Sequence, residues 1–86
     1  MTLDNIRRSL DAMWYYTHAY GDEYLTIARK VSAEHPWIID GKDFFCRIYL
    51  EDDRFRIADF RAQIPDDKWF ARGSQVIEHI KKQFPL

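Results

Sequence analysis

The chain has 86 residues, of which 47% are hydrophobic and 31% are charged, so it can bury one core but has no room for two. Thirteen Lys and Arg residues stand against 14 Asp and Glu residues, which gives a net charge of −1 at pH 7. This balance excludes a strongly basic nucleic-acid-binding chain and an acidic mimic of nucleic acid. We therefore expect a single domain over residues 1–86.

The first element is predicted to be a helix over residues 3–20. Leu3, Ile6 and Leu10 recur at spacings of three and four residues, which places them on one helical face. Thr2 can cap the start of this helix, and Gly21 stands where a helix end favours a left-handed residue.

A second helix is predicted over residues 22–34, because Tyr24, Ile27 and Val31 form a one-sided stripe. A strand over residues 24–31 is the alternative, and it would give the order helix, three strands, helix. That order resembles double-stranded-RNA-binding domains, whose last helix starts with lysines that grip phosphates. Here the corresponding position reads Asp66-Asp67-Lys68-Trp69, so the resemblance stops where the function would lie.

The middle of the chain predicts strands. Residues 37–39 form a short apolar run before the turn dipeptide Asp40-Gly41. A hairpin then follows, with strands over residues 43–51 and 54–64 around Asp52-Asp53. The two-residue turn predicts four opposite pairs: Glu51 with Arg54, Leu50 with Phe55, Tyr49 with Arg56, and Ile48 with Ile57. The apolar phase changes near Ala58-Asp59, which predicts a bulge there.

The last element is predicted to be a helix that starts at Asp66 or Asp67 and ends before Pro85, with an interruption allowed at Gly73-Ser74. Its expected apolar face holds Trp69, Gly73, Val76, Ile77, Ile80 and Phe84. The fold class is therefore α+β: two N-terminal helices, an antiparallel β-hairpin or three-stranded meander, and a C-terminal helix packed on one sheet face.

No residue pattern indicates catalysis. His18, His35 and His79 fall in three separate elements. Six aspartates stand at turns or at a helix start, where Asp bonds to the backbone: Asp40, Asp43, Asp52, Asp53, Asp66 and Asp67. Cys46 takes a core-facing strand position and is expected to be a structural, unreactive thiol. We therefore predict no enzyme, no catalytic residue, no metal and no cofactor.

Cys46 is also the only cysteine, so an internal disulfide is excluded. Small secreted domains usually rely on disulfides, which favours a reducing compartment. The first residues lack the apolar segment of a signal peptide, and no apolar run approaches the ~20 residues that cross a bilayer. The expectation is a cytoplasmic protein that does not engage membranes.

Two groups of side chains are candidate partner-binding residues. The first is the hairpin face opposite Phe44, Cys46, Ile48 and Leu50, because arginines and aromatic rings are enriched at interfaces. It holds Phe45, Arg47, Tyr49, Arg54 and Arg56. The second group is Trp14, Tyr15 and Tyr16, which cannot all share one face of the predicted first helix.

These residues predict a small intracellular protein–protein interaction or regulatory module whose partner is another protein or a second copy in a homodimer. The alternative is a nucleic-acid-binding domain that uses the hairpin face, which the neutral charge disfavours.

Overall fold

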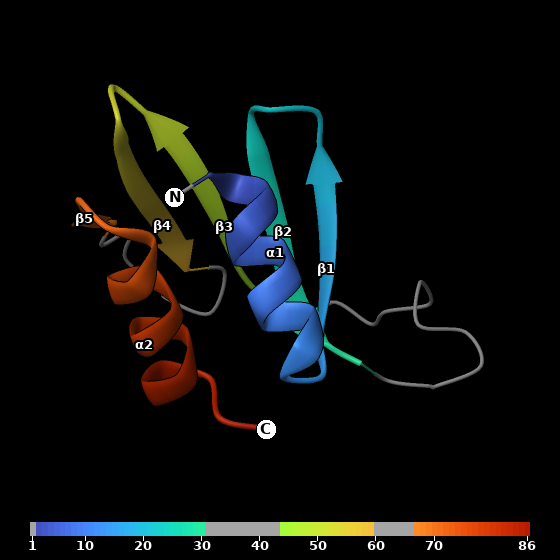
Figure 1. Cartoon of the computed structure of the whole chain (residues 1–86). Helices are drawn as coiled ribbons and strands as arrows, with labels where there is room; N and C mark the ends of the chain where they lie inside the picture. Colours follow the sequence, from blue (N-terminus) through green and yellow to red (C-terminus); the bar gives the residue numbers. More distant parts are fainter. Residues whose placement is uncertain (1, 31–43, 60–66) are drawn as a thin grey trace.

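A computed structural model describes residues 2–30, 44–59 and 67–86, and it confirms the α+β class. The elements in chain order are α1 (Leu3–Ala12), β1 (Tyr15–Tyr20), β2 (Tyr24–Arg29), β3 (Phe44–Glu51), β4 (Arg54–Asp59), β5 (Lys68–Phe70) and α2 (Gly73–Gln83). The five strands form one antiparallel sheet in chain order, and both helices lie against the same face of it (Figure 1).

The predicted first helix is too long. Leu3, Ile6 and Leu10 are buried as expected, but α1 stops at Ala12, and the aromatic residues that follow form strand β1. Aromatic and β-branched side chains favour the extended backbone, which explains the change. Gly21, at φ 54°, belongs to the β1–β2 turn and not to a helix end.

The predicted second helix is wrong, and the strand alternative is confirmed as far as Arg29. β2 lies between β1 and β3, and its residues 25–28 are all buried. A strand buried on both faces shows no alternation of apolar and polar residues, so its sequence imitates the spacing of a helix.

The β3–β4 hairpin has the predicted register at all four pairs. Asp52 and Asp53 have φ values of 50° and 62°, which are the two left-handed positions of a type I′ turn. Leu50 faces Phe55 as predicted but is 39% exposed, because it borders a hollow of about 300 Å³ beside the start of α1.

Within the described residues, the sheet has its bulge on β3, and β4 shows none up to Asp59. β4 keeps its register with β3 through Asp59, whereas the β2–β3 pairing shifts between Ile27 and Ala28, and this shift leaves Phe45 as the extra residue. Residues 37–41 and 60–64, which carry the other strand and turn predictions, lie outside the described residues.

The last helix begins later than predicted. Residues 68–70 form strand β5, which places Trp69 opposite Arg56 in the sheet, and α2 begins at Gly73, where an interruption was allowed. The Gln75 side chain accepts a hydrogen bond from the Arg72 backbone N–H at 3.1 Å, which satisfies a donor at the helix start.

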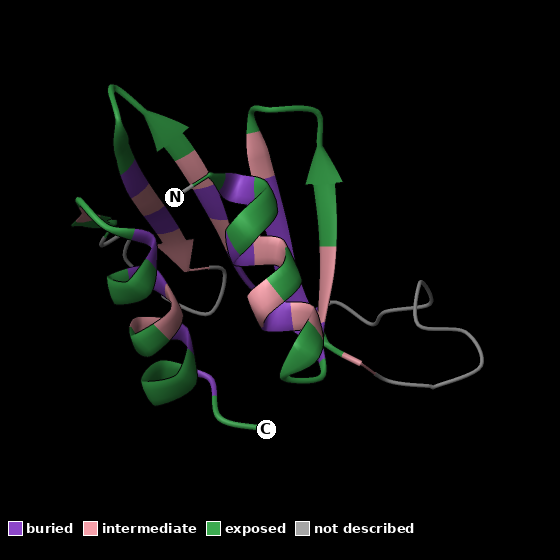
Figure 2. Ribbon diagram, viewed as in Figure 1, coloured by how far each residue is buried: buried purple, intermediate pink, exposed green. Residues whose placement is uncertain are grey.

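The core lies between the two helices and the sheet (Figure 2). Its fully buried side chains come from both layers and include Ile6, Leu10, Leu25, Ile27, Ile48, Ile57, Val76 and Ile80. One buried hydrogen bond joins the two ends of the fold: the Tyr15 hydroxyl donates to the Phe84 carbonyl oxygen at 2.7 Å.

Candidate functional site

The candidate site is the sheet face that points away from α1 and α2, which we call the outer face. Alternation along the strands turns Leu25, Ile27 and Ile48 toward the helices, so their neighbours in the chain point to the outer face. None of the described helices covers this face. It therefore presents its larger side chains to the surroundings, whereas Thr26 and Ala28 in strand β2 are buried.

Five side chains cross the outer face in one line, which we call the aromatic row. Each stands directly opposite the next in the strand pairing, so the row runs through all five strands. In order from β1 to β5, the row consists of Tyr20, Tyr24, Tyr49, Arg56 and Trp69.

The rings of the aromatic row stack against one another. The ring centroids of Tyr20 and Tyr24 are 5.0 Å apart at an interplanar angle of 17°, and those of Tyr24 and Tyr49 are 5.2 Å apart at 41°. Neighbouring strands are themselves about 4.8 Å apart, so the rings stand upright on the sheet. The surroundings therefore meet the ring edges, while much of each ring face is covered by a neighbour.

Arg56 continues the row and is held from three sides. Its guanidinium carbon lies 4.1 Å from the ring centroid of Tyr49, and its nitrogens contact Glu51 and Asp67, each at 2.8 Å. The hydrogen bond with Glu51, assisted by the one with Asp67, raises the pKa of Arg56 above its usual value. The two carboxylates fix the side chain and offset its charge.

Two further predicted arginines also lie against rings of the row. Arg54 is 5.0 Å from the ring of Trp69, and Arg47 is 5.0 Å from the ring of Tyr24. A side-chain hydrogen bond with Tyr49 is the main cause that raises the pKa of Arg47. The structure thus brings together the predicted residues Arg47, Tyr49, Arg54 and Arg56.

Phe45 and Tyr15 do not share the outer face, so their predicted exposure is wrong. The bulge turns Phe45 toward the helices, where its ring stacks on Phe84 at 5.0 Å and meets Tyr15 edge-on at 6.1 Å. Burial raises the pKa of Tyr15. Both side chains belong to the core, whereas Tyr16, next in the strand, points to the outer face and is half-buried.

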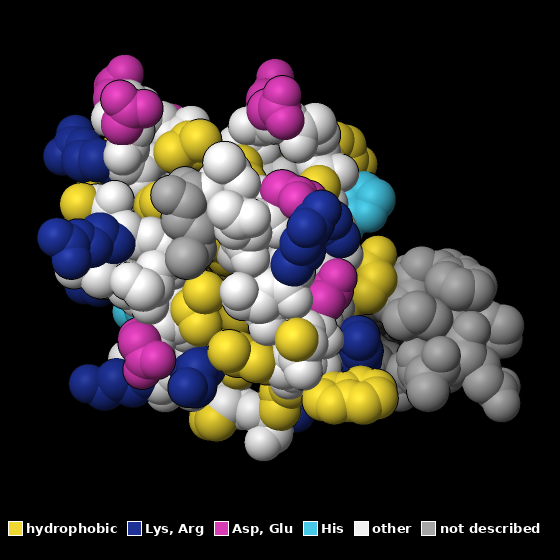
Figure 3. Space-filling view, in the orientation of Figure 1, with side chains coloured by type: hydrophobic (Ala, Val, Ile, Leu, Met, Phe, Trp, Pro, Cys, Tyr) yellow, Lys and Arg dark blue, Asp and Glu magenta, His cyan; other side chains and the backbone are white. Residues whose placement is uncertain are grey.

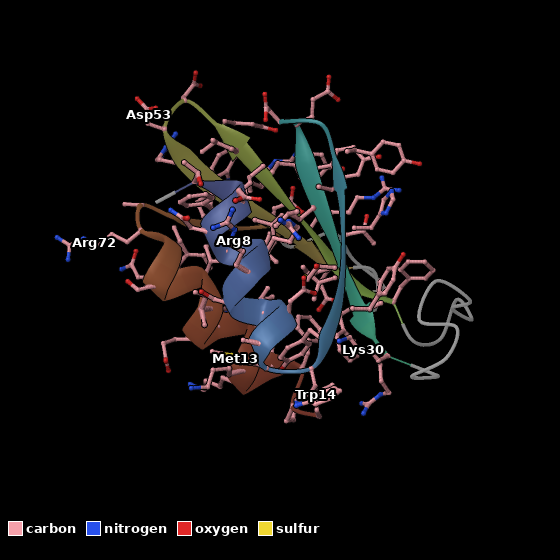
Figure 4. All side chains as sticks on the ribbon, turned by 45° about the vertical axis from the view of Figure 1, so that its right-hand side comes forward. Arg8, Met13, Trp14, Lys30, Asp53 and Arg72 are labelled. Atoms are coloured by element: carbon pink, nitrogen blue, oxygen red, sulfur yellow. The ribbon has the colours of Figure 1, made fainter. Side chains whose placement is uncertain are left out.

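Trp14 lies apart from the aromatic row, at the turn between α1 and β1. It is 70% exposed at φ 71°, a backbone conformation that is rare for a bulky residue. The Lys30 ammonium nitrogen lies 5.1 Å from its ring, and Figure 4 shows both residues at the end of the molecule opposite Asp53. The expected grouping of Trp14 with Tyr15 and Tyr16 on one helix is therefore wrong.

The sequence reading missed three members of the row: Tyr20, Tyr24 and Trp69. Tyr20 and Trp69 are 56% and 44% exposed. Each was assigned to a predicted helix, whereas the structure places it in a strand, so its pairing partner was hidden. One feature of the sequence could have revealed them: the strand alternative over residues 24–31. Pairing Tyr24 with Tyr49 extends the predicted hairpin by one strand.

Two further titratable groups, Cys46 and His79, lie on the helix side of the sheet or at its border. Burial raises the pKa of the Cys46 thiol, which keeps it protonated and unreactive. Burial is the main cause that lowers the pKa of His79, and the positive charge of Lys68 is the second cause. Within residues 2–30, 44–59 and 67–86, no group of three or more His, Cys, Asp or Glu residues could hold a metal ion.

Comparison with protein-family models, curated proteins and solved structures finds no match. Neither of the two described helices is long and apolar enough to cross a membrane.

Proposed function

We propose that this chain is a small non-catalytic interaction module that binds another protein on the outer face of its sheet. The observation that carries the proposal is the aromatic row, which places three tyrosines, an arginine and a tryptophan in one line across five strands. Tyr, Trp and Arg are the residue types that contribute most binding energy at protein interfaces.

Preorganisation supports the same proposal. Tyr20, Tyr24 and Tyr49 already stack on one another, and two carboxylates hold Arg56 in place. Side chains that are ordered before binding lose little conformational entropy when a partner docks. The row is thus suited to a partner that packs apolar groups on the ring edges and accepts hydrogen bonds from tyrosine hydroxyls.

Nucleic acid is the alternative partner, and the geometry supports it less. Bases bind to sheets by stacking on free ring faces, but inside the aromatic row the faces of Tyr24 and Tyr49 already contact neighbouring rings or the Arg56 guanidinium. Arg56, the central cation, is already paired with Glu51 and Asp67. A phosphate would have to compete with both carboxylates.

The test compares a variant of the aromatic row with a matched variant on the helix side. Tyr24→Lys and Trp69→Ser alter the outer face, whereas Arg8→Ser alters an exposed side chain of α1. Proteins captured from the source cells by the parent chain are purified, and their affinities are measured by calorimetry. We expect at least about tenfold weaker binding for each row variant and no change for Arg8→Ser.

A parallel titration uses a single-stranded thymidine oligonucleotide at low and high salt. Binding that is steeply weakened by salt and lost in Tyr24→Lys and Trp69→Ser would contradict the proposal in favour of nucleic acid. A purified partner that binds all variants equally would show that the outer face is not the docking surface.

A further inference from the structure

Among the described residues, strand β1 is an edge of the sheet that lacks the usual protection against pairing. His18, Ala19 and Tyr20 are all exposed although they point alternately to the two faces, so this part of the strand is covered on neither side. Its sequence Tyr15–Tyr20 contains no lysine, arginine or proline, and it pairs with β2 without a bulge. Natural edge strands usually carry one of these devices.

The opposite edge shows the contrast. β5 has only three residues, Lys68–Phe70, and one of them is a lysine. Short length and a charged side chain are the common ways to prevent an edge from accepting another strand. The sheet is therefore open to extension at β1 and guarded at β5.

We infer that β1 pairs antiparallel with β1 of a second copy, joining the two five-stranded sheets into one continuous sheet. Residues that are directly opposite in an antiparallel pair point to the same face, which restricts the possible registers. Placing the twofold axis at His18 satisfies this rule: each His18 faces the other, Thr17 faces Ala19 of the second copy, and Tyr16 faces Tyr20 of the second copy.

The aromatic row supports this register. Tyr20 ends the row at the β1 edge, and it stacks on Tyr24 in the β2 direction. With the axis at His18, Tyr16 of the second copy continues the line of rings beyond Tyr20. An axis at Thr17 would instead place Trp14 opposite Tyr20, but the φ of 71° takes Trp14 out of the extended conformation.

Charge complementarity favours a second copy in the antiparallel direction. Asp22 and Glu23 follow the Tyr20 end of β1 and are exposed, and Figure 3 shows acidic side chains gathered at the tips of the two hairpins. Lys30 lies at the other end of the strand, beside Trp14. Antiparallel pairing brings each acidic end next to the Lys30 end of the other copy, whereas parallel pairing would bring the two acidic ends together.

Sedimentation velocity of the whole chain from about 1 to 100 µM tests the association, because a small interface of this kind is expected to have a micromolar dissociation constant. His18→Lys places two ammonium groups opposite each other and should raise the dissociation constant at least about tenfold. Ala71→Lys adds the same charge at an exposed bend after β5 and should change nothing. A parent chain that stays monomeric at the highest concentration would overturn the inference.

Cross-linking tests the register. The single native cysteine, Cys46, is buried, so a thiol introduced at an exposed position is the only accessible one. His18→Cys should form a disulfide-linked dimer on mild oxidation, and Thr17→Cys and Ala71→Cys should not. Equal cross-linking of all three variants would overturn the inference, and efficient cross-linking of Thr17→Cys alone would overturn the register.

A charge exchange tests the orientation. Asp22→Lys should weaken the dimer about fivefold, and adding Lys30→Asp should restore it.

The inference does not rest on the proposed function: Trp69→Ser lies at the guarded edge and should leave dimerisation unchanged. Loss of the dimer in His18→Lys with partner binding intact would separate the two surfaces, and a dimer unaffected by Asp22→Lys would overturn the antiparallel arrangement.

Discussion

Consecutive residues of β3 serve two different environments. Ile48 is fully buried beneath the helices, whereas Tyr49, the next residue, points to the outer face and stacks between Tyr24 and Arg56. The helix side of the sheet is filled by aliphatic side chains and by buried rings such as Phe45 and Phe55, which pack with α1 and α2. The outer face carries rings and guanidinium groups that contact one another. Folding energy and binding capacity are thus assigned to opposite faces of the same strands.

The largest effect is expected from a charge placed on the helix side. Ile80→Asp puts a carboxylate at a fully buried position of α2, within the buried stripe that Ile80 forms with Val76 and Phe84. The expected loss is several kcal/mol of the free energy of unfolding, on the order of the whole stability of a small domain. Circular dichroism on heating should show no cooperative transition. Lys81→Asp, at the next and exposed position, is the control, and equal melting of both variants would show that α2 is not docked.

A neighbouring pair on one strand compares the two faces directly. Ile48→Ala leaves a cavity in the core and should cost about 2–5 kcal/mol. Tyr49→Ala removes a half-buried ring from the outer face and should cost about 1 kcal/mol. Urea denaturation of both variants gives the comparison. Comparable losses would mean that the aromatic row stabilises the fold as much as the core does, and would weaken its assignment to binding.

The polar contact within the core gives a smaller effect. Tyr15→Phe removes the hydroxyl that donates to the Phe84 carbonyl oxygen and leaves that oxygen without this partner. We expect a loss of about 1–2 kcal/mol. Tyr16→Phe, on the outer face, is the matched control and should unfold within about 0.5 kcal/mol of the parent. The same urea measurement would contradict the assignment if the two variants were equally stable.

The smallest effect is a gain, and it concerns the turn that keeps the two faces distinct. A shift of one residue in the β3–β4 register would exchange the faces, and the turn at Asp52-Asp53 prevents this shift. Asp53 has φ 62°, so Asp53→Gly should stabilise the fold by about 0.5–1 kcal/mol. Asp22→Gly, in the other hairpin turn but without a positive φ, should bring no such gain in the melting temperature.

The two hairpins show how far the sequence determines the fold. The β3–β4 hairpin was predicted to the residue, because a two-residue turn and strict alternation act together. The β1–β2 hairpin was mistaken for two helices, because β2 is buried on both faces and has no alternation to read. The strand conformation of β1 and β2 therefore depends on pairing between strands, which the spacing of apolar residues along the chain does not encode.

The candidate site follows the same division. Arg47, Tyr49, Arg54 and Arg56 stand in the correctly predicted hairpin, and they were placed on the correct face. Phe45 was misplaced because the bulge on β3 depends on its pairing with β2. The aromatic row itself could not be foreseen, since three of its five members come from elements whose type was wrong.

The hydrogen bond between Tyr15 and Phe84 has a consequence for the order of events during synthesis. Each described strand pairs with its neighbours in the chain, so the meander can grow while the ribosome is still translating. The Phe84 carbonyl and ring, which cover the side of the core that holds Tyr15, leave the ribosome 69 residues after Tyr15. The nascent sheet therefore keeps part of its apolar surface uncovered until Phe84, directly after α2, emerges. During this interval the chain is most exposed to unwanted association.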